Sequence, residues 1–157
     1  MKYFTSFVLF ALCISCVNVE NEEDRSHSRQ PLFALAENCG IDFVNRLSPT
    51  TKFSTFDYQY YQNGGGVAVA DFNNDGLKDV FFTSNLESDK LFLNKGDLKF
   101  EDITKTANVS GFEHSITNSW STGATICDVN QDGYMDIYVC KSGHFKAGLV
   151  TQNLLYV

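Results

Sequence analysis

The chain has 157 residues, of which 43% are hydrophobic, and a formal net charge of −7 at pH 7. It contains no basic run, and 19 acidic residues outnumber 12 basic ones, which argues against nucleic-acid binding through phosphate neutralisation. The aromatic content of 14% favours a fold of strands rich in aromatic side chains.

Residues 1–16 have the pattern of a lipoprotein-type signal peptide. Lys2 supplies the positive charge, and the apolar run 4–14 is too short to span a membrane. The run ends in Leu-Cys-Ile-Ser-Cys, which resembles the bacterial lipobox and places Cys16 at the lipidated position, although Cys13 stands where leucine is usual. Ordinary secretory cleavage near this point is the alternative.

Residues 17–33 are polar and charged without a hydrophobic pattern, which predicts a disordered acidic tether. Acidic residues soon after Cys16 resemble the surface-export signal of Bacteroidota lipoproteins, and a plain solvated linker is the alternative. A bacterial lipoprotein carries more than one lipid chain, so the anchor would be firm. We therefore expect an exported protein that is attached to the outer membrane or cell surface through its lipid anchor only. Secretion is the alternative.

Residues 34–63 are predicted to form a lead-in β segment. Four aromatic residues lie close together in it, namely Phe56, Tyr58, Tyr60 and Tyr61. An alternating strand with one buried face is the preferred interpretation, and a carbohydrate-binding surface is the alternative.

Two nine-residue segments carry the strongest pattern in the chain. One reads Asp-Phe-Asn-Asn-Asp-Gly-Leu-Lys-Asp from Asp71, and the other reads Asp-Val-Asn-Gln-Asp-Gly-Tyr-Met-Asp from Asp128. Each stands between two short runs with the composition of strands, so each is predicted to be a hairpin loop. The recurrence indicates a repeat whose loops are loaded with carboxylates.

The spacing of these loops suits calcium, a hard cation that takes six to eight oxygen ligands at roughly 2.3–2.6 Å. Side chains at loop positions 1, 3, 5 and 9 converge if the backbone curls, position 7 adds a carbonyl, and glycine at position 6 permits the turn. About two calcium sites are therefore predicted. The expected ligands are Asp71, Asn73, Asp75, the Leu77 carbonyl and Asp79 in the first loop, and Asp128, Asn130, Asp132, the Tyr134 carbonyl and Asp136 in the second.

The loops have two other interpretations. An EF-hand needs glutamate at position 12 and helices on both sides, whereas Phe82 and Val139 stand at that position here, between strand-like flanks. An Asx-rich turn that binds nothing is the remaining alternative, because Asn, Asp and Gly dominate turns. The same four side-chain ligand types at the same places in both loops weigh against it.

The stretch 63–82 resembles an FG-GAP/VCBS repeat, as found in integrin α-chain propellers. Segments 90–96, 100–104 and 120–123 resemble large bacterial VCBS-repeat proteins related to the cartilage acidic protein family. The resemblance runs from about Gly40 to the last residue. It implies an all-β fold of β-propeller blades, each with four antiparallel strands and a calcium loop between the first two. It implies no enzyme activity.

The resemblance predicts two blades and the residue ranges of their strands. In the first blade, residues 64–111, strands are expected at 66–70, 80–84, 90–94 and 99–103, with a hairpin turn at 95–97 and a polar crossover with one helical turn at 104–111. In the second, residues 112–157, they are expected at 122–127, 137–141 and 153–157, with a loop at 142–152 and one strand missing. Because propellers need four to eight blades, we expect an incomplete N-terminal fragment of a larger propeller.

Three further cysteines, Cys39, Cys127 and Cys140, form an odd set. Hairpin register is expected to place Cys127 opposite about Ile137 and Cys140 opposite about Ala124. The two thiols would then be ~10 Å apart along the ladder, too far for a disulfide. Both are predicted to be small buried hydrophobic residues.

No constellation in the sequence predicts catalysis. The three histidines are isolated, and no zinc spacing, Gly-x-Ser-x-Gly elbow, P-loop or dinucleotide motif occurs. Glu101 and Asp102, at a strand end, are expected to be solvated or capping groups. The leading functional hypothesis is a calcium-binding propeller module at the cell surface, acting in adhesion through an extracellular glycan or protein. The alternative is the non-catalytic propeller part of a larger secreted or surface enzyme, such as a polysaccharide hydrolase.

Overall fold

The computed structural model describes residues 31–48, 54–111, 120–142 and 152–157. Leu35–Val157 form one compact unit, and Met1–Ala34 are a separate one. The predicted signal peptide, Cys16, most of the tether and most of the loop at 142–152 lie outside the described residues. Within the part that the structure describes, no helical segment has the length and hydropathy needed to cross a bilayer.

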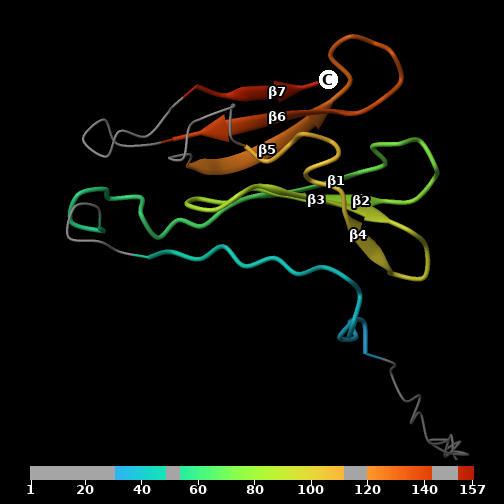
Figure 1. Cartoon of the computed structure of the whole chain (residues 1–157), viewed down its shortest axis with the longest axis horizontal. Coiled ribbons are helices and arrows are strands. Elements are labelled where there is room, and N and C mark those ends of the chain that lie inside the picture. Colours follow the sequence, from blue (N-terminus) through green and yellow to red (C-terminus); the bar gives the residue numbers. More distant parts are fainter. Residues whose placement is uncertain (1–30, 49–53, 112–119, 143–151) are drawn as a thin grey trace, which may run out of the picture. The chain divides into compact units, whose positions relative to one another are not determined.

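The first sheet contains four antiparallel strands in chain order, as predicted (Figure 1). The turn before the fourth strand closes where Lys95 N–H donates to the Lys99 carbonyl at 2.7 Å. Gly96 adopts a φ of 89° there, in the region that glycine enters without steric penalty. The strands are β1 (Val67–Ala70), β2 (Asp79–Phe82), β3 (Lys90–Asn94) and β4 (Phe100–Asp102).

The second sheet contains three antiparallel strands, so the described fold is all-β as predicted. The strands are β5 (Ser121–Cys127), β6 (Asp136–Lys141) and β7 (Leu154–Tyr156). Between the sheets the chain makes the expected helical turn, in which Ala107 N–H donates to the Ile103 carbonyl at 2.9 Å. Asp102 caps this turn by accepting from Thr104 N–H at 3.0 Å, which is the capping role expected for it.

One prediction about the cysteines is wrong. The ladder pairs Cys127 with Asp136 and Cys140 with Gly123, within one residue of the expected partners, and both thiols are free as expected. Both thiols are exposed, not buried. The reason is strand alternation: residues that neighbour the core-facing Ile126 and Val139 point to the opposite face of the sheet.

An apolar layer joins the two sheets. Phe81, with Ala68 and Leu91 directly beside it across the ladder, forms the inner face of the first sheet. Ile137 and Val139 of β6 pack into the same cluster, in which Phe81 and Val139 have no exposed surface. Every second residue of β1 and β2 is buried, which is the pattern of a sheet with one covered face, and all of these residues except Asp79 are apolar.

A buried carboxylate also links the sheets. Asp89 is 1% exposed. It accepts a hydrogen bond from Ser84 N–H at 2.7 Å and one from the Ser121 hydroxyl, at the start of β5, at 2.9 Å. Burial raises the pKa of Asp89 to about 6, although both hydrogen bonds and the nearby Lys141 charge favour the ionised form. Gly111 packs so closely that a Cβ there would lie 2.3 Å from Oδ2 of Asp89.

The lead-in 34–63 was predicted as a β segment, but it contains no strand in its described residues, 34–48 and 54–63. It runs along the first sheet as extended chain held by individual contacts (Figure 1). Phe100 N–H donates to the Cys39 carbonyl at 2.7 Å, and Phe43 stacks on Phe82 with ring centroids 4.6 Å apart. Asn45 then exchanges hydrogen bonds with Asn85 at 2.8 and 3.1 Å. One backbone hydrogen bond and several side-chain contacts therefore replace a ladder.

The aromatic run in the lead-in forms turns, so the predicted alternating strand is wrong. Tyr58 N–H donates to the Ser54 carbonyl, and Tyr61 N–H donates to the Tyr58 carbonyl, both at 3.0 Å. A spacing of three residues therefore places Tyr58 and Tyr61 on one side, each with its ring centroid 5.4 Å from that of the buried Trp120. Phe56 remains exposed.

The buried carboxylate of Asp89 predicts that the stability of the fold depends on pH. Its folded pKa of about 6 lies above the unfolded value, so the folded state binds more protons between about pH 4 and pH 6. This group therefore adds about 2–3 kcal/mol to the free energy of unfolding as the pH falls from 7 to 4. We expect Asp89→Asn to lose that increment in denaturant titrations at the two pH values, whereas the exposed control Asp97→Asn keeps it. An unchanged pH dependence in Asp89→Asn would contradict the assignment.

Candidate metal centre

The first loop, residues 71–79, is wound around one carboxylate. Asp71 Oδ1 accepts from Asp75 N–H at 3.0 Å, and its Oδ2 accepts from Gly76 N–H at 2.8 Å. The winding needs left-handed backbone at two places, where Asn74 has a φ of 57° and Gly76 a φ of 87°. Asparagine and glycine are residues that enter this region readily. The sequence thus specifies the curl that was predicted.

Positions 3 and 5 join the same ring of hydrogen bonds. Asn73 Oδ1 accepts from Asp75 N–H at 3.2 Å, and its amide group donates to Asp75 Oδ2 at 2.9 Å. Asp75 Oδ1 accepts from Leu77 N–H at 2.8 Å. The hydrogen bond from Leu77, followed by that from Asn73, lowers the pKa of Asp75 and keeps this exposed carboxylate ionised.

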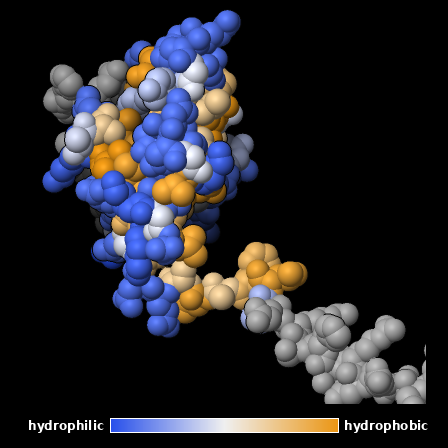
Figure 2. Space-filling model, turned by 90° about the vertical axis from the view of Figure 1, so that its right-hand side faces the viewer, coloured by the Kyte–Doolittle hydropathy of each residue, from blue (hydrophilic) through white to orange (hydrophobic). Residues whose placement is uncertain are grey.

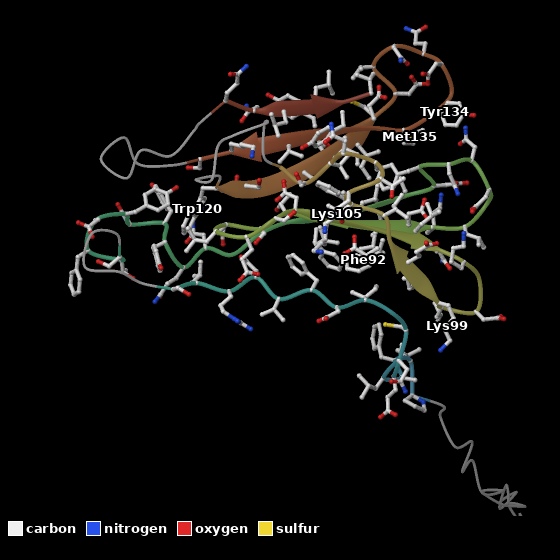
Figure 3. The ribbon with its side chains drawn as sticks, in the orientation of Figure 1. Phe92, Lys99, Lys105, Trp120, Tyr134 and Met135 are labelled. Atoms are coloured by element: carbon white, nitrogen blue, oxygen red, sulfur yellow. The ribbon has the colours of Figure 1, made fainter. Side chains whose placement is uncertain are left out.

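The second loop, residues 128–136, repeats this arrangement bond for bond. Asp128 accepts from Asp132 N–H at 3.2 Å and from Gly133 N–H at 2.9 Å. The left-handed positions recur at Gln131, with a φ of 63°, and Gly133, with a φ of 88°. The remaining bonds join Asn130 to Asp132 at 2.9 and 3.0 Å and Tyr134 N–H to Asp132 at 2.8 Å. Figure 3 labels Tyr134 and Met135 in this loop.

Position 9 has a role that the sequence did not reveal. Asp79 and Asp136 are 0% and 3% exposed, and each accepts from the backbone N–H of loop position 2, at 2.9 Å from Phe72 and 2.8 Å from Val129. Asp79 also accepts from Asn94 N–H at 2.8 Å, and the Asn94 amide donates to the Lys78 carbonyl at 3.0 Å. Asn94 therefore braces the first loop from β3. The one sequence signal for this role of Asn94 was its position as a polar residue at the end of an apolar strand.

The donor set decides which metals these loops can accept. Each predicted ligand is a carboxylate, amide or carbonyl oxygen, the ligand type of hard cations, and neither loop contains His or Cys. In the described ranges, no three His, Cys, Asp or Glu side chains already converge as a metal cluster. Positions 1, 3 and 5 share one ring, while position 9 is engaged by backbone N–H groups. The donor chemistry fits calcium, and the ligand assignment remains a prediction.

The loops are open to solvent and carry concentrated negative charge. Asn73, Asp75, Asn130 and Asp132 are exposed, so an ion can reach them directly. Figure 2 views the molecule from the side where the loops lie in Figure 1, and this surface is mainly hydrophilic. Lys78 is the single basic residue in the first loop, and Met135 stands at its place in the second. Each loop has three aspartates within nine residues, and their negative charges repel one another unless a cation neutralises them.

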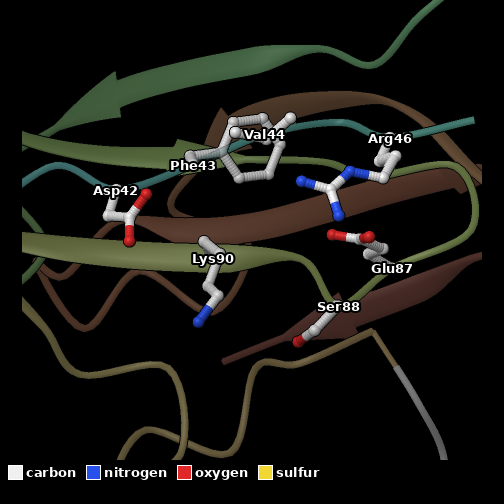
Figure 4. Close-up of a pocket in the computed structure, with 7 residues that line it drawn as sticks. All are labelled: Asp42, Phe43, Val44, Arg46, Glu87, Ser88 and Lys90. Atoms are coloured by element: carbon white, nitrogen blue, oxygen red, sulfur yellow. The ribbon is translucent and has the colours of Figure 1, made fainter.

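A pocket elsewhere on the chain lies between the lead-in and the first sheet (Figure 4). It has a volume of about 280 Å³, and Phe43 lines it while stacking on Phe82. Its lining has two acidic and two basic side chains: Lys90 pairs with Asp102 at 2.6 Å, and Arg46 points toward Glu87. This balance leaves no concentrated charge of one sign in the pocket. The lining residues are Asp42, Phe43, Val44, Arg46, Glu87, Ser88 and Lys90.

Two antiparallel sheets, each with the same Asp-rich loop between its first two strands, show a repeated all-β unit that is consistent with blades of an incomplete β-propeller. Residues 71–139 match the FG-GAP-like repeat, a span that includes both loops. A 78-residue segment is 33% identical to cartilage acidic protein 1 of Xenopus tropicalis. That segment covers 49% of this chain and 11% of that protein, so the chain matches a small part of its relative. Both matches agree with the predicted resemblance to FG-GAP repeats, and the FG-GAP-like match covers the part of the chain that contains the two loops.

The bracing role of position 9 predicts a stability effect that needs no metal. Asp79→Ala removes the acceptor of two backbone N–H groups, those of Phe72 and the buried Asn94. We expect a loss of about 2–4 kcal/mol in the free energy of unfolding, measured by denaturant titration with chelator present. Asp75→Ala, at an exposed position of the same loop, should lose much less. Equal losses in the two variants would contradict the assignment.

Proposed function

We propose that the two loops each hold one calcium ion and that the repeat is a calcium-stabilised binding module. One observation carries the proposal: two loops far apart in sequence fold into the same ring of hydrogen bonds with the same ligand types at positions 1, 3, 5 and 9. A turn needs only one or two such residues to reverse the chain. Three aspartates per loop exceed that need and favour a cation.

The residues have distinct parts in this proposal. Asp71, Asn73 and Asp75 supply exposed side-chain oxygens, the Leu77 carbonyl adds a backbone oxygen, and Asp79 connects the site to the sheet. The second loop uses Asp128, Asn130, Asp132, the Tyr134 carbonyl and Asp136 in the same way. Bound calcium supplies charge neutralisation and a cross-link between strands. A loop of exposed oxygens suits calcium better than magnesium, which demands a near-ideal octahedron.

The module is proposed to work outside the cell in adhesion, through an extracellular glycan or protein. FG-GAP-like repeats are in general non-catalytic modules, which supports binding as the role. The export pattern of residues 1–16 and the acidic tether 17–33 support a lipid-anchored protein at the outer membrane or cell surface, with Cys16 as the anchor. Calcium affinities of about 10⁻⁴–10⁻³ M are typical of extracellular modules and are expected here.

Calorimetric titration tests the calcium sites. We expect two ions per chain, and one ion in Asp75→Ala and in Asp132→Ala, because each variant removes a central ligand. Lys78→Ala is the matched control within the first loop and should retain both ions. At about 100 times the dissociation constant, calcium should stabilise the fold by about 2.7 kcal/mol per site in thermal melts.

Two results would refute calcium binding, namely the absence of both binding heat and a chelator effect on melting, or full stoichiometry in Asp132→Ala. The binding role has a second readout in the same samples. Retention of the chain on immobilised glycans and cell-surface proteins should depend on calcium and fall in both loop variants. If chelator does not change retention, the binding surface does not depend on the calcium loops.

Anchoring has its own test. Metabolic labelling with a palmitate analogue should mark the wild type and miss Cys16→Ser, because the thiol of Cys16 is the proposed attachment point. Cys13→Ser is the matched control, since it lies in the same segment and should keep the label. Label that survives in Cys16→Ser would refute the assignment.

A further inference from the structure

We propose that the two loops are coupled through Asn74, so that loading either loop with calcium strengthens calcium binding at the other. This inference rests on the proposed calcium sites. The carrying observation is a hydrogen bond between the loops, in which the Asn74 amide donates to the Gly133 carbonyl at 3.0 Å. Asn74 is position 4 of the first loop and is not one of its predicted ligands. Its side chain is therefore free to serve the neighbouring loop.

Asn74 is held in the ring of the first loop. It stands between two predicted ligands, Asn73 and Asp75, with a left-handed φ of 57°. The N–H group that follows it, that of Asp75, donates to Asp71 Oδ1 at 3.0 Å. A cation that fixes positions 1, 3 and 5 must therefore also fix the backbone from which the Asn74 side chain projects.

In the second loop, the acceptor lies next to the predicted ligands. The peptide group that joins Gly133 to Tyr134 receives the Asn74 hydrogen bond at its carbonyl and donates its N–H to Asp132 Oδ1 at 2.8 Å. The N–H of Gly133 donates to Asp128 Oδ2 at 2.9 Å. A single residue is thus bonded to Asn74 and, through its two peptide groups, to the carboxylates at positions 1 and 5.

The sheets keep the two loops at a fixed separation. Figure 1 shows the loops at the same end of the two sheets. At the start of β1 the backbones approach so closely that a Cβ on Gly66 would lie 2.9 Å from Gly123 Cα in β5. Both loops follow strands that are packed at this contact. A change in one loop therefore reaches the other without movement of the sheets.

The coupling follows from shared ordering. When the first loop binds its ion first, it loses conformational freedom. Through Asn74 it then restricts the peptide group between Gly133 and Tyr134 in the second loop. The second ion then meets a loop that is already partly ordered, so its affinity rises, and linkage makes the effect reciprocal. One hydrogen bond of about 1 kcal/mol corresponds to a change in affinity of about fivefold.

The test is calcium titration of the full chain, with loop 2 followed at the backbone NMR signals of Gly133 and Tyr134. Asn74→Gly removes the side chain and keeps a residue that accepts positive φ. We expect loop 2 affinity to fall about fivefold in Asn74→Gly and in Asp75→Ala, and no further in the double variant. Gln131→Gly is the matched control, because Gln131 holds position 4 of the second loop with a φ of 63°. It should leave loop 1 affinity within about twofold.

Three outcomes are separable. A fall in loop 2 affinity in Asn74→Gly and Asp75→Ala, with non-additivity in the double variant, supports the coupling. Two bound ions with loop 2 affinity unchanged in both variants overturn the coupling and leave the calcium sites intact. The absence of any calcium-dependent signal in the wild type overturns the proposed sites and the coupling together. Hydrogen exchange of the Tyr134 amide adds a metal-free readout, and unchanged exchange in Asn74→Gly would also overturn the link.

Discussion

In each sheet, the loop between the first two strands has its backbone wound around one carboxylate. The rest of the architecture depends on this winding. Asp71 and Asp128 each accept two backbone N–H groups of their own loop. The curl requires left-handed backbone at positions 4 and 6. Because the loop closes on itself, the two strands that flank it lie side by side and run antiparallel. The same closure leaves carboxylates exposed, and they provide the oxygen ligands for the proposed calcium sites.

The contact between the sheets combines apolar packing with a buried polar link. Phe81 and Val139 supply a dry layer, while Asp89 joins Ser84 to Ser121 across the sheets. A buried carboxylate is unfavourable unless its hydrogen bonds are satisfied, and here both oxygens accept one. Apolar burial gives adhesion between the layers without fixing their register. The directional bonds of Asp89 fix it, which brings the two loops to the same end of the sheets.

That placement gives the candidate site properties that a single loop lacks. Asp79 and Asp136 connect the exposed oxygens to buried strand ends, so the rigidity of the sheets reaches the loops. Asn94 reinforces the first loop from β3. The hydrogen bond from Asn74 to Gly133 joins the loops to each other. In the proposed function, the two loops form one calcium-dependent surface that acts in adhesion.

The sequence by itself determined what depends on near neighbours along the chain. Strand alternation, the nine-residue loops and the turn at Gly96 are local, so the strands were placed within two residues and the curl was predicted. Tertiary structure decided the rest. The lead-in became extended chain, and its aromatic run became turns around Trp120, because partners distant in sequence bind them. The second structural role of Asp79 and the link through Asn74 also join distant residues. Such contacts leave no periodicity in the sequence, because they depend on how the sheets pack.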